Sequence, residues 1–160
     1  MSNFPARAGR GDPIVLQTRK LIEDAERAAA MHSSDLNEFA RQILAGRRQR
    51  ERFFDPLLFS NPAWDVLLNL YIAEADGRPL DVLDCCIVPG VPQGVVLRWL
   101  GYLKQEEMVS EVPDAADPRR TVIRLSESTR LAVSAYLGSL ISLGLGTEFV
   151  LPDFTPPKAS

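Results

Sequence analysis

The chain has 160 residues, with 18 Lys and Arg against 21 Asp and Glu, and 46% of its residues are hydrophobic. This composition is typical of a globular protein and disfavours the disordered, collagen-like and disulfide-rich classes. Residues 1–52 carry ten basic against seven acidic side chains, and residues 53–160 carry eight against fourteen. This charge balance does not by itself suggest a polyanionic partner.

The two ends of the chain and its longest uncharged stretch lack the features of targeting and membrane segments. Residues 1–13 contain no apolar core, so we expect no signal peptide, and we expect both 1–13 and 151–160 to be flexible. The uncharged stretch Leu131–Thr147 is interrupted by glycines and serines, so it is a poor membrane span. We therefore expect a soluble, cytoplasmic protein with no membrane partner.

Two helices are predicted near the N-terminus. The first spans Ile14–Met31, with a loose apolar stripe, and His32-Ser33-Ser34 breaks it. The second is capped by Asp35 and runs to about Phe53. It ends in a basic run over 47–52. This run either complements the helix dipole or faces phosphates, and both interpretations remain open.

Three further helices are predicted in the middle of the chain. Ala63–Ala75 has the clearest helical period, and the glycine at 77 ends it. Asp81 caps a short helix over 82–88. A third helix begins with Pro92 and runs to about Glu107. Its buried side chains are expected to be Val96, Leu100 and Leu103.

The pattern then changes to that of β-structure. Val109–Val112 and Thr121–Leu125 read as two short strands, and residues 113–120 form a polar loop between them. A last helix, from Ser126 to about Leu143, is apolar around much of its circumference. We expect it to be buried against something large, such as a second subunit.

Cysteine and histidine usage argues against catalysis and metal binding. Cys85 and Cys86 are adjacent, which excludes a CxxC site. We expect both to be buried helix residues, with a redox switch as the alternative. The single histidine, His32, has no second candidate ligand nearby in sequence. No phosphate-binding glycine motif is present. We therefore expect no enzyme, no metal and no cofactor.

The order of helix, helix, turn, helix, strand, loop and strand is that of a winged helix-turn-helix, here a mostly α fold with a small β-hairpin wing. In this arrangement the helix over 92–107 enters a major groove, and the loop over 113–120 reaches the phosphates or the minor groove. Arg119 and Arg120 are the cationic pair of the loop. Asp117 can hold one of their guanidinium groups in place.

Three blocks between residues 47 and 136 resemble a branch of the MarR family of winged-helix regulators. They are Pro62-Ala63-Trp64-Asp65-Val66-Leu67-Leu68-Asn69-Leu70-Tyr71, then Gly90-Val91-Pro92 with Leu97-Arg98-Trp99-Leu100, and finally Asp117-Pro118-Arg119-Arg120 ahead of Leu125-Ser126. The resemblance implies a homodimeric transcriptional regulator that binds a pseudopalindromic operator in double-stranded DNA. It also implies helices for dimerisation and support over 14–55, a DNA-binding domain over 56–126 and a C-terminal dimerisation helix over 127–150.

Family members commonly bind small aromatic effectors, so the resemblance also suggests a crevice for one. Its candidate lining is Trp64, Tyr71, Phe53 and Phe54, with plain core packing as the alternative. The candidate DNA contacts are Gln93 (to adenine), Arg98 (to the phosphate backbone), Asp117, Arg119 and Arg120, with Lys104 and Arg48 as outlying phosphate contacts. Arg98 would instead pair with Asp65 or Asp84 if it served the fold. Trp99 is expected to pack rather than to read bases.

The chain departs from that branch at positions that matter for DNA binding. Gly94 and Val95 stand where two hydroxyl residues usually begin the recognition helix, and hydroxyls can donate to phosphates or base edges. Glu107-Met108 replaces the usual glycine before the first strand. Between residues 98 and 124, five cations face five anions, whereas DNA-binding surfaces usually carry cationic excess. The second hypothesis is therefore a protein-interaction module with weak or no DNA binding.

Overall fold

The computed structural model describes residues 19–20, 23 and 33–145. It is mostly helical, with one two-stranded antiparallel hairpin, which confirms the predicted fold class. In chain order the elements are α2 (Ser33–Arg50), α3 (Pro56–Phe59), α4 (Pro62–Ala75), α5 (Val82–Cys85), α6 (Gln93–Gln105), β1 (Val109–Pro113), β2 (Thr121–Leu125) and α7 (Glu127–Ser142). No helix in these ranges is long and apolar enough to cross a membrane.

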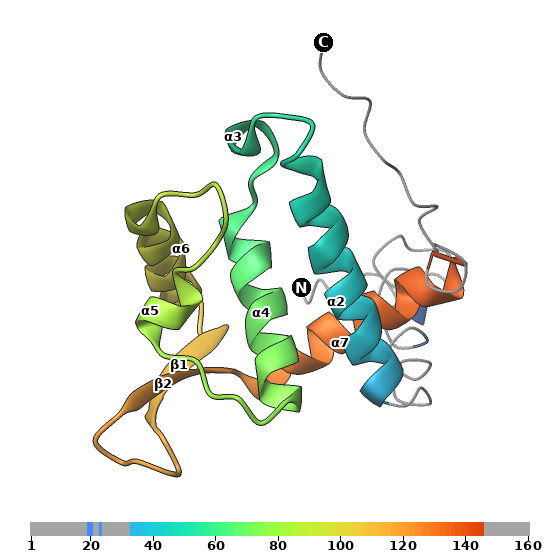
Figure 1. Cartoon of the computed structure of the whole chain (residues 1–160). Coiled ribbons are helices and arrows are strands. Elements are labelled where there is room, and N and C mark those ends of the chain that lie inside the picture. Colours follow the sequence, from blue (N-terminus) through green and yellow to red (C-terminus); the bar gives the residue numbers. More distant parts are fainter. Residues whose placement is uncertain (1–18, 21–22, 24–32, 146–160) are drawn as a thin grey trace, which may run out of the picture.

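Helix α4 is the centre of the fold and lies between α2 and α6 (Figure 1). Asn61 caps it, because its side chain accepts a hydrogen bond from the Trp64 N–H at 3.3 Å. Val66 and Leu70 are fully buried as well. Both lie outside the apolar stripe that the helical period predicts, which consists of Trp64, Leu67, Leu68, Tyr71, Ile72 and Ala75. The predicted single stripe was therefore too narrow, since neighbours cover α4 on more than one face.

The N-terminal predictions are partly corrected. Ser33 and Ser34 belong to α2 rather than to a break before it, and Asp35 lies in the first turn instead of capping the helix. Serine and aspartate are both tolerated there, because first-turn amides are unpaired and the dipole favours an acidic side chain. Of the predicted helix 14–31, only residues 19, 20 and 23 are described, and all three are helical. His32 lies outside the described residues, as do 1–13 and 146–160.

The end of α2 also differs from the prediction. The helix ends at Arg50, and hydrogen bonds from the Phe53 and Phe54 N–H groups to the Arg50 carbonyl, both 3.0 Å, close the following turn. Pro56 then begins α3, a single helical turn that the sequence analysis did not predict. A four-residue helix is too short to show a hydrophobic period.

The helix-turn-helix core follows the predicted caps closely. Asp81 caps α5, and Asp84 completes a capping box: each side chain accepts from the other residue's N–H, at 2.9 and 3.1 Å. The α5 helix ends at Cys85, earlier than the predicted residue 88. Pro92 is the N-cap of α6 rather than its first helical residue, because its ψ of 136° is extended. Val96, Leu100 and Leu103 are buried, as predicted.

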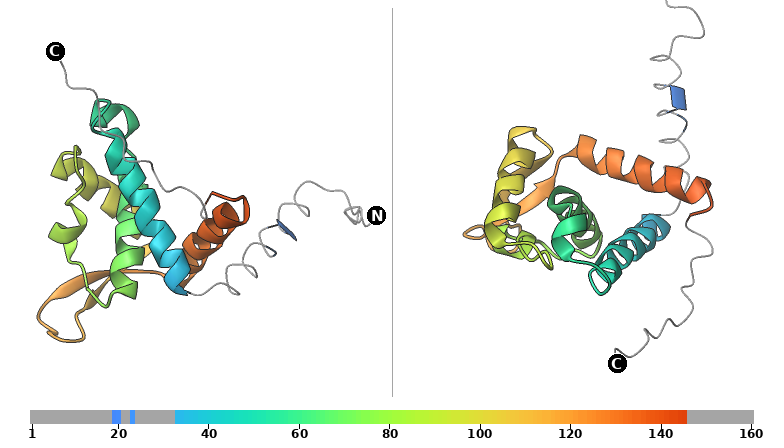
Figure 2. Two further views of the ribbon diagram at one scale, coloured as in Figure 1. Left: turned by 45° about the vertical axis from the view of Figure 1, so that its right-hand side comes forward. Right: turned by 90° about the horizontal axis from the view of Figure 1, so that it is seen from above.

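The hairpin is tied to the helices at its base and projects away from them at its tip (Figure 1). Val109 lies opposite Leu125, and Pro113 lies opposite Thr121, so β1 extends one residue beyond the prediction. Leu80, just before α5, bridges to Ile123, and the Glu74 carboxylate accepts from the Leu125 N–H at 2.8 Å. Helix α7, capped by Ser126, then runs from the hairpin back to α2 (Figure 2).

Candidate nucleic-acid interface

Helix α6 presents one face to the core and the opposite face to solvent. Its buried side chains hold it against α4, and four residues at offsets of 0, 4, 7 and 11 form a row on the outside. This outer row of α6 consists of Gly94, Arg98, Gly101 and Gln105, all exposed. A groove-binding helix needs such an unobstructed face.

The guanidinium of Arg98 makes no ion pair or hydrogen bond within the described part of the chain. Its two predicted carboxylate partners are occupied by other arginines. Asp65 binds Arg47, and Asp84 binds Arg120. Arg98 therefore does not form the ion pair with Asp65 or Asp84 that was the alternative prediction. Its side chain remains open to a partner outside the chain.

Gln93 and Lys104, the other α6 candidates, are less favourably placed. Gln93 is exposed at the first position of α6, but its spacing puts it in the row of Val96 and Leu100, which face the core. The Lys104 ammonium binds the Glu111 carboxylate on β1. Much of its charge is thereby neutralised before any phosphate approaches.

The wing loop carries Arg119 at its exposed tip. The Arg119 side chain is 93% exposed. The Asp117 carboxylate accepts from its backbone N–H at 3.1 Å and from its Nε at 3.4 Å, as the sequence predicted for one of the two arginines. The turn geometry fixes the backbone of Arg119. Its guanidinium pairs with Asp117 but stays exposed, so that it can still meet a phosphate.

Arg120, its neighbour, points back into the domain. Its guanidinium lies 3.2 Å from Asp84, 3.5 Å from Asp81 and 3.6 Å from the buried Asp114. Backbone bonds reinforce this junction, since the Asp114 N–H donates to the Arg120 carbonyl at 2.8 Å. Arg120 thus ties the wing to α5. It does not share the open position of Arg119.

The surroundings of Asp81 at this junction favour its ionised form. The Asp84 backbone N–H, which donates to the Asp81 carboxylate, holds the pKa of Asp81 below its ordinary value, and Arg120 lowers it further. Because the ionised form of Asp81 is favoured in the fold, its contribution to stability is present above about pH 4. It is lost as the pH falls through the lowered pKa.

One flank of α6 is apolar and partly exposed. Trp99 and Tyr102 are 40% and 50% exposed and meet edge to face, with ring centroids 6.0 Å apart. Val95 lies on the same flank. The expectation that Trp99 is a packing residue therefore holds only in part. Such a flank can contact thymine methyl groups or a protein partner.

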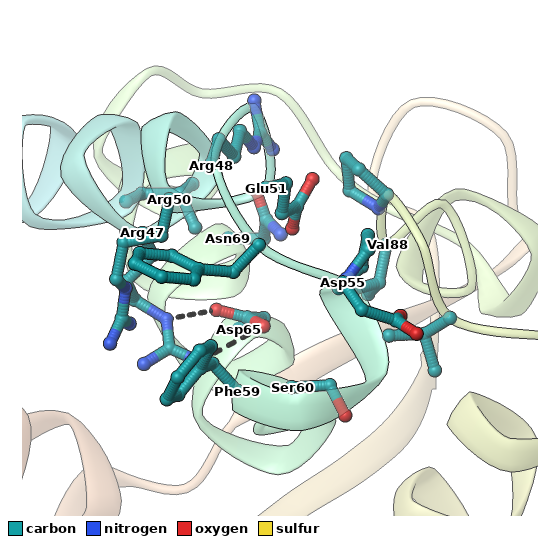
Figure 3. A pocket seen from close by; sticks show the side chains of 15 residues that line it. Arg47, Arg48, Arg50, Glu51, Asp55, Phe59, Ser60, Asp65, Asn69 and Val88 are labelled. Atoms are coloured by element: carbon teal, nitrogen blue, oxygen red, sulfur yellow. Dashed lines mark hydrogen bonds and ion pairs between the residues drawn. The ribbon is translucent and has the colours of Figure 1, made fainter.

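A pocket opens between the end of α2, α3, the start of α4 and the turn that precedes α6 (Figure 3). Its floor holds a largely buried ion pair: Arg47 Nε lies 2.5 Å from Asp65 Oδ1, and Nη2 lies 3.2 Å from Oδ2. Arg48 and Arg50 line its rim, and the Arg50 guanidinium lies over the Phe59 ring at 5.8 Å. Three arginines of the predicted basic run thus line this pocket.

The aromatic crevice predicted from the resemblance is not assembled as expected. Of the four residues proposed for it, Phe54 lines the pocket. Trp64 instead stacks edge to face on Tyr136 of α7 at 5.3 Å. The Tyr71 hydroxyl hydrogen-bonds Ser134 at 2.9 Å. Trp64 and Tyr71 therefore join α4 to α7, which is the packing alternative.

The two cysteines are free and buried. Burial raises the pKa of Cys85 to about 12, and it also raises the pKa of Cys86. Within the described residues, no group of three or more metal-ligating side chains comes together.

Two features of the candidate interface were not predicted from the sequence, for different reasons. The outer row of α6 was visible as glycines seven residues apart with an arginine between them. The Arg120 junction joins residues more than 30 positions apart, and no local pattern reveals such a pair.

No protein-family model and no curated protein matches the chain. Among solved structures, S. aureus MepR bound to ethidium bromide is similar to it. The match has 20% sequence identity and a TM-score of 0.44, and it covers 66% of this chain and 76% of that chain.

Proposed function

We propose that the protein is a MarR-like DNA-binding transcriptional regulator, without catalytic activity. Residues 56–126 would form the DNA-binding unit, with α6 in the major groove and the loop over 113–120 on phosphates or in the minor groove. The observation that carries this proposal is the exposed face of α6, with an unpaired Arg98, beside a projecting hairpin tipped by the exposed Arg119. A chromosomal partner would require a cytoplasmic location.

The candidate residues then take different roles. Arg119 contacts a phosphate, and Asp117 holds its backbone in place. Gln93 and Lys104 remain proposed contacts at the two ends of α6, with Lys104 weakened by its pairing to Glu111. Arg120, which we first grouped with Arg119, acts by positioning the wing through its three carboxylate partners.

The salt dependence of duplex binding tests the wing. Each phosphate contact adds about 0.9 to the slope of log K against log salt. We expect Arg119→Ala to weaken binding to all duplex sequences and to flatten this slope by about 1. Arg41→Ala is the control, because it removes the same charge from α2, which lies on the opposite side of α4 from α6 (Figure 1). Arg41 pairs with an aspartate, Asp76, as Arg119 pairs with Asp117, and its loss should leave the slope unchanged. An unchanged slope in Arg119→Ala would exclude the wing as a phosphate contact.

A homodimer is the second part of the proposal. Helix α7 and the residues after it leave large apolar side chains exposed, namely Leu131, Tyr136, Leu143 and Leu145. Exposed apolar area of this kind is typical of an interface. A second copy would also supply the second recognition helix that a pseudopalindromic operator needs. Sedimentation equilibrium should give twice the 17.7 kDa of the chain, and a monomer at micromolar concentration would contradict this part.

The alternative function is a protein-interaction module, and the apolar flank formed by Val95, Trp99 and Tyr102 favours it. Salt-dependent duplex binding separates the two functions when it is measured for the wild type and for a variant in which serine replaces Trp99 and Tyr102. A regulator that uses the outer row of α6 keeps salt-dependent duplex binding in this variant. An interaction module shows no such binding even in the wild type.

The pocket beside α3 is the proposed place for a small aromatic effector. Phe54 and Phe59, which line it, offer rings that such a ligand can contact. Titration with benzoate, followed by the NMR shifts of these two rings, tests the proposal. Rings that do not respond at millimolar benzoate would contradict it.

A further inference from the structure

We propose that Arg98 reads a guanine from the centre of the outer row of α6, and that Gly94 and Gly101 allow the helix backbone to lie close enough for it to do so. This inference rests on the proposed function, because it concerns how α6 meets a major groove. It makes Arg98 the specificity-determining residue, rather than the phosphate contact expected from the sequence.

The first step is the space around Arg98. Gly94 lies four residues before it and Gly101 three residues after it, so the two glycines flank Arg98 along the outer row. A Cβ atom added at either glycine would have no atom within 4 Å. The fold therefore does not require glycine at these positions. In a helix, glycine is also the least favourable residue except proline. Glycine at positions 94 and 101 is therefore consistent with close approach of the helix backbone to a partner.

The second step is the charge of Arg98. In α6 and the wing, the charges of Lys104, Arg119 and Arg120 each face a carboxylate of the domain. Arg98 has no such partner in the described residues. Its guanidinium therefore retains all its donors for a ligand.

The third step is the identity of the partner group. In the major groove, guanine presents the O6 and N7 acceptors side by side, and arginine is the side chain that binds both at once. Phosphates line the edges of a groove, whereas the centre of an inserted helix face meets the base edges. Because Arg98 lies at the centre of the outer row of α6, we place it against base edges rather than phosphates. The neighbouring flank, which holds Val95 and Tyr102, is apolar.

Selection from a randomised duplex library tests the proposal. Sites selected by the wild type should contain a preferred guanine, and replacing it should weaken binding about tenfold or more. Arg98→Ala should lose this discrimination. Arg98→Lys keeps the charge but not the planar two-pronged donor set, so it should retain the salt slope and lose most of the guanine preference.

A glycine substitution tests the close approach independently of charge. Gly101→Ala should raise the Tm by about 2–4 °C, because alanine favours the helix, and yet weaken binding to the selected site about tenfold. Gly46→Ala in α2 is the matched control, since a Cβ there also meets no atom within 4 Å. It should raise the Tm similarly and leave binding unchanged.

The outcomes distinguish this inference from the function it rests on. If the wild type shows no salt-dependent duplex binding, both fail. If the wild type binds, and Arg98→Ala keeps the guanine preference or Gly101→Ala keeps full affinity, the inference alone is overturned. Loss of the preference in Arg98→Ala and of affinity in Gly101→Ala, with Gly46→Ala unaffected, supports it.

Discussion

Arg119 and Arg120 are neighbours in sequence with opposite surroundings. Arg119 is almost fully exposed and near one carboxylate, whereas Arg120 is 39% exposed and lies among three. The sequence analysis predicted the same role for both arginines, because composition and spacing carry no information on contacts with Asp81 and Asp84. A variant of one is therefore the natural control for a variant of the other.

We predict that Arg120→Met destabilises the protein by about 1–2 kcal/mol. Its partner Asp114 is buried and would lose its counter-charge, while the exposure of Arg120 itself limits the cost. Arg119→Met should cost less than about 0.5 kcal/mol, as expected at an exposed site. Urea unfolding measures both. Equal losses in the two variants would contradict the role given to Arg120.

The cysteines provide a residue-level prediction about reactivity. With the pKa of Cys85 raised to about 12, its thiolate fraction at pH 8 is about 10⁻⁴. In the native protein, Ellman's reagent should therefore label both thiols slowly. In denaturant, it should label both quickly. Because burial disfavours the thiolate, stability should also fall as the pH rises above the ordinary value of 9. Rapid labelling of the native protein would contradict this prediction and support the alternative that the two cysteines act as a redox switch.

At the level of elements, caps and periods were largely predictable and contacts between distant segments were not. Asp81 caps the helix that the sequence assigned to it, and β2 has its predicted bounds. The last helix was predicted to start at Ser126, which is its N-cap. These features depend on neighbours within a few residues. The Arg47–Asp65 pair and the α3 turn depend on how α2 meets α4, which no periodicity encodes.

The end of α6 has a backbone geometry that usually requires glycine. Glu107 has a φ of 55°, and the Met108 N–H donates to the Leu103 carbonyl at 2.9 Å, a glycine-type helix end. We predict that Glu107→Gly stabilises the protein by about 1 kcal/mol, since glycine adopts this conformation without strain. Glu106→Gly, at a φ of −80°, should instead destabilise it by about 0.5–1 kcal/mol. The sign difference in urea unfolding is the test, and the same sign for both would contradict the geometry.

The turn before α6 is fixed by contact with α3. Gly90 has a φ of 70°, and a Cβ there would lie 2.3 Å from the Pro56 Cβ. Gly77 has a similar φ of 65° with nothing within 4 Å. We predict that Gly90→Ala costs about 2 kcal/mol more than Gly77→Ala, because both carry the backbone strain and only Gly90→Ala adds the clash. Thermal or urea unfolding decides, and equal costs would show that α3 does not hold this turn.

For the whole molecule, the net charge of −3 makes DNA binding depend on where the charges lie. Most cations of α6 and the wing are already paired within the domain. Non-specific attraction to phosphates should therefore be weak, and base contacts from α6 should supply a large share of the affinity. Under the proposed function, the protein would differ in this respect from regulators that approach DNA with a broad basic surface.

The most direct test of this account is an NMR titration of the ¹⁵N-labelled chain with duplex carrying a selected site. The account predicts that the largest amide shifts fall on the outer row of α6, with Gly94 and Gly101 as isolated glycine signals, and on wing residues 115–119. Shifts confined to α3 or α7, or their absence at low salt, would contradict the claim that α6 and the wing together bind DNA.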